Sequence, residues 1–174
     1  MSEYSLNTSN INEWVTSLKA GDRVLLSGKV YTARDAAHKK IASLIAENKE
    51  TPFDIDGSVV YYAGPTPAKE GLVIGSIGPT TSSRMDCFSP LMISLGQKAM
   101  IGKGLRNEEV VNAMKEYGAV YFAAVGGAGA LYSKCIQKCE VIAFEELGCE
   151  SVKELLVEDF PLIVAIDSNG GTLY

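Results

Sequence analysis

The chain has 174 residues, of which 47% are hydrophobic and 21% are charged, values typical of one globular domain that buries its own core. Its formal net charge of -5 argues against a nucleic-acid partner, because such proteins need a basic face that displaces counterions. Residues 1–5 lack the basic flank and apolar core of a signal peptide, and every apolar run is shorter than the ~20 residues of a membrane-spanning helix. We therefore expect a soluble, cytoplasmic protein with neither nucleic acid nor membrane as a partner.

The first predicted elements are a short helix and a strand. Apolar residues at helical spacing between residues 10 and 18 predict an amphipathic helix that is anchored by Trp14. Residues 23–31 are rich in β-forming residues and predict a strand, with a bulge or bend at Gly28. This strand passes directly into a second predicted helix.

The second helix carries the first candidate site residues. Thr32 and Asp35 form an N-cap pattern at its start. Its expected buried stripe comprises Ala37, Ile41, Leu44 and Ile45. Arg34 and His38 are four residues apart, so they project from the same side of the first turns. They are either solvent-facing helix residues or parts of a site that combines a cation with a group titrating near neutral pH.

Two apolar runs of strand length follow, and each ends at a Gly-Pro pair. Residues 59–63 end at Gly64-Pro65, and residues 72–77 end at Gly78-Pro79. Both runs predict core strands that open into loops facing a ligand.

The second half of the chain alternates helices and strands. Ser89-Pro90 predicts a helix start, and a helix from Asn107 to Gly118 precedes an apolar strand over residues 119–125. Further strands are predicted over residues 140–144 and 161–167. No internal repeat or linker interrupts this alternation, which predicts a single α/β domain.

Two segments combine a cation with hydroxyl groups or glycines. Residues 80–84, Thr-Thr-Ser-Ser-Arg, follow a predicted strand, where backbone N–H groups, hydroxyls and a guanidinium together suit a carboxylate or phosphate. The alternative is a hydroxyl-rich surface turn. Lys103 lies between Gly102 and Gly104, which leaves room for a ligand beside it, although turn lysines are also common in this context.

Two other motifs favour a structural interpretation. Residues 126–129, Gly-Gly-Ala-Gly, lack the spacing of a dinucleotide-binding motif and the lysine of a P-loop, so they indicate close packing of a strand against a helix. The cysteines match no zinc-site spacing and are expected to be buried free thiols. They are Cys87, Cys135, Cys139 and Cys149. The ligands of any metal are therefore expected to be groups other than these cysteines.

Together these stretches make the chain similar to a known family. The matching stretches occur in order along most of the chain and comprise residues 28–38, 62–65, 78–86, 101–104, 126–128 and 144–161. They resemble the β subunit of the two-subunit, iron-sulfur-dependent class I fumarate hydratases and of the related L-tartrate dehydratases. The resemblance implies a single domain over residues 1–174 with a swivelling β/β/α fold.

The resemblance also implies a reaction, a cofactor and a partner. The reaction adds water to, or removes it from, a small dicarboxylic acid, and reversible hydration of fumarate to malate is the expected activity. A [4Fe-4S] cluster is expected on a partner α subunit rather than on this chain, within a hetero-oligomer such as a heterotetramer. Dehydration of L-tartrate and non-catalytic binding of a dicarboxylate are the alternatives.

Position by position, the resemblance assigns a role to each candidate residue. The substrate-binding residues would be Arg34, Arg84 and Lys103. Thr80 would be the catalytic base with Thr81 as a supporting hydroxyl, and nearby positive charge would be required because an isolated threonine hydroxyl is far too weak a base. Asp35 and His38 would position Arg34 rather than transfer a proton.

Overall fold

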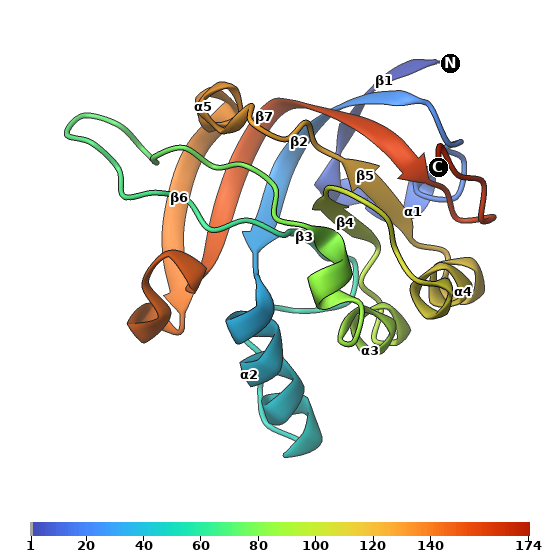
Figure 1. The fold of residues 1–174 in the computed structure, drawn as a ribbon, viewed down its shortest axis with the longest axis horizontal. Coiled ribbons are helices and arrows are strands. Elements are labelled where there is room, and N and C mark those ends of the chain that lie inside the picture. Colours follow the sequence, from blue (N-terminus) through green and yellow to red (C-terminus); the bar gives the residue numbers. More distant parts are fainter. Residues whose placement is uncertain (1) are drawn as a thin grey trace.

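The architecture is one sheet that is flanked by short helices (Figure 1). The computed structural model describes residues 2–174. The strands lie in the order β1-β2-β3-β4-β5-β7-β6. Their bounds are β1 Glu3–Asn7, β2 Arg23–Thr32, β3 Val59–Tyr61, β4 Ala99–Gly102, β5 Val120–Ala123, β6 Ile136–Ala143 and β7 Val152–Ile166. Strands β1 to β5 pair with one another in parallel, in that order. Strand β7 is antiparallel to β2, β5 and β6.

The helices are short and connect the strands. The α-helices are α1 Ile11–Trp14, α2 Asp35–Ala46, α3 Ser89–Ser94, α4 Glu108–Tyr117 and α5 Gly129–Tyr132. The 3₁₀ helices are η1 Thr8–Asn10, η2 Ser82–Met85, η3 Ser133–Cys135 and η4 Glu145–Glu150. Helices α2, α3 and α4 gather on the same side of the sheet (Figure 1).

The long strand β7 closes part of the sheet into a barrel. It pairs with β5 near its C-terminal end and with β2 along most of its length. Strands β2, β3, β4, β5 and β7 therefore form a closed ring, which leaves fewer open sheet edges than a flat sheet would.

Alternate side chains of the strands build two separate cores. Tyr61 and Phe122 belong to the core inside the ring, together with Trp14 from α1. Val60 and Tyr121, the neighbours of these strand residues, point the other way and pack beneath helices α2, α3 and α4. The period of two along each strand accounts for this division.

Elements with local sequence signals are confirmed. Strand β2 has a register shift at Gly28, which has a φ of +110°, and a Cβ at this position would lie 2.3 Å from Thr8 Oγ1. Helix α4 begins after Asn107, whose side chain accepts a hydrogen bond from the Val110 amide, and it ends at Gly118 with a φ of 69°. Helix α3 carries its proline at the N-terminus, as Ser89-Pro90 predicts.

The predicted strand over residues 72–77 is wrong. The place beside β3 is taken by β4, so this segment has no strand to pair with. It forms one side of an arm, residues 64–78, which is drawn in green in Figure 1 and held by hydrogen bonds between Thr66 and Ser76. Leu72 is 60% exposed near the tip of the arm.

Three other expectations differ at element boundaries. Thr32 belongs to β2 and Arg34 is the N-cap residue of α2, without a side-chain capping bond, so the N-cap prediction is wrong. The first helix is a single turn after a 3₁₀ turn, although Trp14 is buried as expected. Strand β1 and the first nine residues of β7, 152–160, were not predicted, because their pairing is non-local.

Across residues 2–174, no helix has both the length and the apolar character needed to cross a membrane.

Candidate functional site

The predicted site residues gather at one edge of the sheet. Strands β2 to β5 are parallel, so their C-terminal ends share this edge, where ligands of parallel sheets are commonly bound. Arg34 follows β2 by two residues, and Lys103 follows β4 directly. Residues 80–84 return to the same edge at the end of the arm.

Backbone hydrogen bonds hold residues 80–84 between β3 and β4. The Thr80 amide donates to the carbonyl of Tyr62 over 2.7 Å. The Ser82 amide donates to the carbonyl of Lys103 over 2.9 Å, and Thr81 is the bridge partner of Lys103. The structure therefore places Thr81 beside the lysine and Thr80 beside the end of β3.

Asp35 pairs with Arg84 rather than with Arg34. Its Oδ1 accepts from Arg84 Nε over 3.0 Å, and its Oδ2 lies 2.9 Å from the NH2 nitrogen of the same guanidinium. One edge of the arginine fork is thus occupied by Asp35, and the arginine side chain remains 51% exposed. Asp35 therefore orients Arg84 through two nitrogens, and the third nitrogen, NH1, takes no part in this pair.

Arg34 is held by a carboxylate that sequence analysis missed. Its Nε lies 3.6 Å from Glu150 Oε1, and its side chain is only 22% exposed. A Cβ at Gly64 would lie 3.0 Å from Arg34 NH1, so the absence of a side chain at Gly64 makes room for the guanidinium. Glu150 comes from η4, 116 residues further along the chain, and no local motif connects it with Arg34.

His38 is buried beneath the site in a neutral form. Its Nδ1 lies 2.8 Å from the carbonyl oxygen of Arg34, so Nδ1 carries a proton and donates it. The ring stacks on Phe88 and meets Tyr62 edge-on. Burial, helped by the charge of Arg106 and opposed by the Arg34 hydrogen bond, lowers the pKa of His38 from 6.5 to about 4. This geometry supports a positioning role rather than proton transfer.

We expect His38 to make stability fall in mild acid. Its folded pKa is depressed, so the unfolded chain binds the extra proton as the pH falls below 6.5, and stability is lost between there and about pH 4. The free energy of unfolding should fall between pH 7 and pH 5 by about 2 kcal/mol more in the wild type than in His38→Phe. Urea titrations at both pH values measure this difference. Equal losses in the two proteins would show that His38 is protonated freely in the folded state.

Lys103 extends over the glycine-rich loop that follows β5. The position that a Gly126 Cβ would occupy lies 3.6 Å from Lys103 Cδ and 3.8 Å from its Nζ. Gly129 packs closely against the arm, because a Cβ there would lie 3.0 Å from the Gly78 nitrogen. Close packing therefore does occur at Gly129, but against the arm rather than between a strand and a helix, while Gly126 borders the site.

The charges of the site suit a ligand with more than one carboxylate. Two arginines and one lysine meet two carboxylates, Asp35 and Glu150, and each carboxylate is paired with one arginine. Within residues 2–174 Lys103 has no carboxylate within ion-pair distance. Fixed cations of this kind bind carboxylate oxygens through charge-assisted hydrogen bonds.

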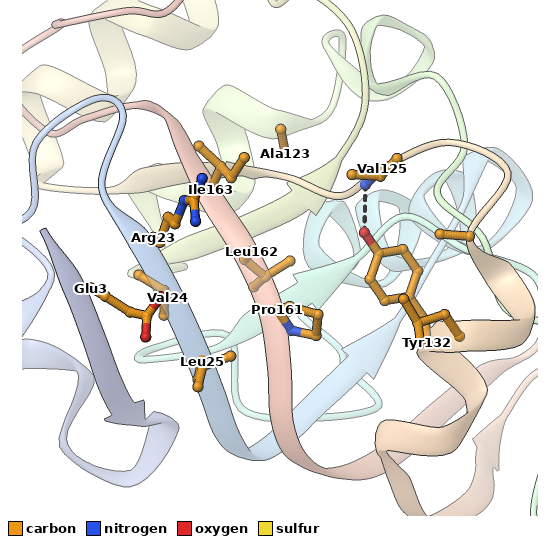
Figure 2. Close-up of a pocket in the computed structure, with 12 residues that line it drawn as sticks. Glu3, Arg23, Val24, Leu25, Ala123, Val125, Tyr132, Pro161, Leu162 and Ile163 are labelled. Carbon is orange, nitrogen blue, oxygen red and sulfur yellow. Dashed lines mark hydrogen bonds between the residues drawn. The ribbon is translucent and has the colours of Figure 1, made fainter. Parts of the chain in front are cut away.

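A separate apolar groove lies along β2 and β7 (Figure 2). Its volume is about 410 Å³, and Leu162, Ile163 and Val125 are among the residues that line it. Tyr132 borders the groove and accepts a hydrogen bond from the Val125 amide (Figure 2). None of the predicted site residues lines this groove.

The cysteines do not form a metal centre on the described chain. Cys135 and Cys139 are half-buried against the core inside the ring, whereas Cys87 and Cys149 are exposed, so the expectation of buried thiols is wrong for the latter pair. Residues 2–174 contain no cluster of three or more His, Cys, Asp or Glu side chains that could hold a metal ion. An iron-sulfur cluster therefore finds no ligand set among these residues.

Comparison with known proteins identifies the family of this chain. The sequence profile of the family described as "Fumarase C-terminus" matches residues 1–174. A Methanocaldococcus jannaschii protein that bears the name of an L(+)-tartrate dehydratase subunit beta is 43% identical over 99% of this chain and 91% of its own length. Fumarate hydratase 2 of Leishmania major is 37% identical over 94% of this chain, and the anaerobic class I fumarate hydratase of Escherichia coli is 38% identical over 87%.

The relatives differ in length, which bears on what this chain can do alone. It covers 29% of the Leishmania major enzyme and 28% of the Escherichia coli enzyme, so it spans under a third of these fumarate hydratases. It covers most of the Methanocaldococcus jannaschii subunit. The chain belongs to the hydro-lyase family that includes the C-terminal part of class I fumarate hydratases and the β subunits of L-tartrate dehydratases.

Proposed function

We propose that this chain is the β subunit of a two-subunit iron-sulfur hydro-lyase that reversibly hydrates fumarate to malate. The observation that carries the proposal is the convergence of Arg34, Arg84 and Lys103 at one sheet edge, where residues 80–84 are hydrogen-bonded to Tyr62 and Lys103. A four-carbon dicarboxylate presents two anionic ends, and three fixed cations can hold both.

The remainder of the active site would come from a partner α subunit. The fumarate hydratases to which this chain is similar are more than three times as long, which leaves most of each enzyme outside the matched region. The [4Fe-4S] cluster would be held by that partner, in a hetero-oligomer such as a heterotetramer in the cytoplasm. The closed sheet with helices on one side would be the swivelling β/β/α fold of this family.

The residues of this chain would bind the substrate and move one proton. Arg34 and Arg84 would hold the carboxylates, and Lys103 would stabilise the negative charge that develops when the proton next to a carboxylate is removed. Thr80, half-buried beside Thr81, would take this proton, because the neighbouring cations favour ionisation of its hydroxyl. Fixed charges that need no rearrangement are effective in such a step.

L-tartrate is the alternative substrate, favoured by the 43% identity with the Methanocaldococcus jannaschii subunit. Both substrates carry two carboxylates, so the cationic residues suit either. The two substrates differ in their hydroxyl groups, and the cations of this chain do not by themselves distinguish this difference.

A kinetic comparison of the two substrates tests the proposal. The chain would be co-purified with its partner without oxygen and assayed with fumarate and with L-tartrate. We expect kcat/KM for fumarate to exceed that for L-tartrate at least tenfold. The reverse order would identify the complex as an L-tartrate dehydratase. If this chain bound a dicarboxylate but the complex showed no turnover, the chain would be a binding module without catalytic function.

A further inference from the structure

A buried arginine lies directly beneath the candidate site. The Arg106 side chain is 0% exposed and its Nε lies 2.7 Å from Asp86 Oδ1. Its NH2 donates to Ser89 Oγ over 2.6 Å, and its NH1 contacts the sulfur of Met100. Asp86 also accepts from the Asn107 amide, so one ion pair joins residues 80–86 to the segment that leads into α4.

Two tyrosine rings enclose this guanidinium. Its central carbon lies 5.3 Å from the ring centre of Tyr62 and 5.0 Å from that of Tyr121. The carbonyl of Tyr62 holds the Thr80 amide. The position of Tyr121 is thus set from one side by Arg106, through a cation–π contact that is strongest where water is excluded.

The hydroxyl of Tyr121 connects the two segments that carry the site. It lies 2.9 Å from the carbonyl oxygen of Gly104 and 2.9 Å from Ser82 Oγ. A carbonyl can only accept, so the tyrosine donates to Gly104 and accepts from Ser82. Burial raises the pKa of Tyr121, which keeps this proton in place.

The space around Ser82 leaves little freedom for this connection. A Cβ at Gly102 would lie 1.9 Å from Ser82 Oγ, so the serine side chain is packed onto the glycine. Ser82 is itself fully buried. The Ser82 hydroxyl is therefore confined between Gly102 and Tyr121, and its position depends on both.

We propose that Tyr121 is a positioning residue that sets the separation between Arg84 and Lys103. Its hydroxyl ties residue 82, two positions before Arg84, to residue 104, directly after Lys103. The inference rests on the proposed function, because this separation would determine which dicarboxylate length spans the two cations. Tyr121 itself does not touch the substrate in this account.

Tyr121→Phe tests the inference, with Tyr61→Phe as the matched control. Both tyrosines are fully buried and both hydroxyls donate to a backbone carbonyl, but Tyr61 bonds to Ile77 inside the ring. Both variants should lower the ratio of folded to unfolded protein by a similar factor of about five. In the complex, we expect KM for the dicarboxylate substrate to rise about tenfold in Tyr121→Phe and less than twofold in Tyr61→Phe. A purely structural role would leave KM unchanged in both variants.

Amide hydrogen exchange on the full chain provides a readout that is independent of activity. The Ser82 amide donates to Lys103, and the Val164 amide, which donates to Asp22, serves as a reference. Tyr121→Phe should lower the protection of Ser82 at least tenfold more than that of Val164, which should fall no further than in Tyr61→Phe. Unchanged protection of Ser82 would overturn the inference. A wild-type complex without hydro-lyase activity would overturn the proposed function, while the exchange result would still decide the role of Tyr121.

Discussion

Replacing Arg106 with Met is expected to lower the free energy of unfolding by about 3–5 kcal/mol, because it leaves the buried carboxylate of Asp86 without its cation. The Asp86 side chain is only 8% exposed and cannot regain water without opening the segment that carries Thr80 and Arg84. Urea unfolding of the chain at neutral pH measures the loss.

Two further variants distinguish the effect of the unpaired buried charge on stability from the effect of lost packing. The double variant Arg106→Met/Asp86→Leu removes both charges and should recover much of the stability, because no uncompensated charge remains. Lys40→Met breaks the exposed ion pair with Glu146 and should have a much smaller effect, because water already screens both charges. A loss in Arg106→Met no larger than that in Lys40→Met would contradict the buried-pair account.

Replacing Arg84 with Lys is expected to reduce kcat/KM of the complex about 100-fold, since a misplacement of about 1 Å at a reacting centre has an effect of this size. The guanidinium holds Asp35 with two nitrogens and has a third for a ligand, whereas an ammonium cannot reproduce this fork. Steady-state kinetics with the preferred substrate measures the change.

An exposed arginine offers a matched control for this substitution. Arg23 lies on β2 beside the apolar groove, so Arg23→Lys should leave kcat and KM within a factor of about two of the wild type. If Arg84→Lys behaves in the same way, Arg84 does not contact the substrate through its fork.

Local signals explain which parts of the fold were predictable. Asn107 and Gly118 mark the two ends of α4 because their side chains or backbone angles satisfy groups within a few residues. Gly28 marks the bulge in β2 because its positive φ is one that glycine adopts readily. By contrast, the closure of the barrel depends on the pairing of β2 with β7, which are more than 100 residues apart. Apolar residues 72–77 read as a strand because sequence alone does not show that β4 fills the place beside β3.

The candidate site shows the same division. Arg34 and Lys103 follow apolar strands, and the parallel strands do bring them to one edge, whereas residues 80–84 reach this edge at the end of the arm. Their carboxylate partners could not be predicted, because the pairs Asp35–Arg84 and Arg34–Glu150 depend on how η2 and η4 sit against α2. A sequence shows residue types, but the choice of partner for each cation is a property of the packed structure.

The central claim is that this chain supplies one half of a hydro-lyase active site. The most direct measurement is fumarate hydration by this chain, by its cluster-loaded partner and by the two together, each purified separately without oxygen. Activity should appear only in the mixture and should saturate at a fixed ratio of the two chains. Hydration by either chain alone at the rate of the mixture would contradict the account.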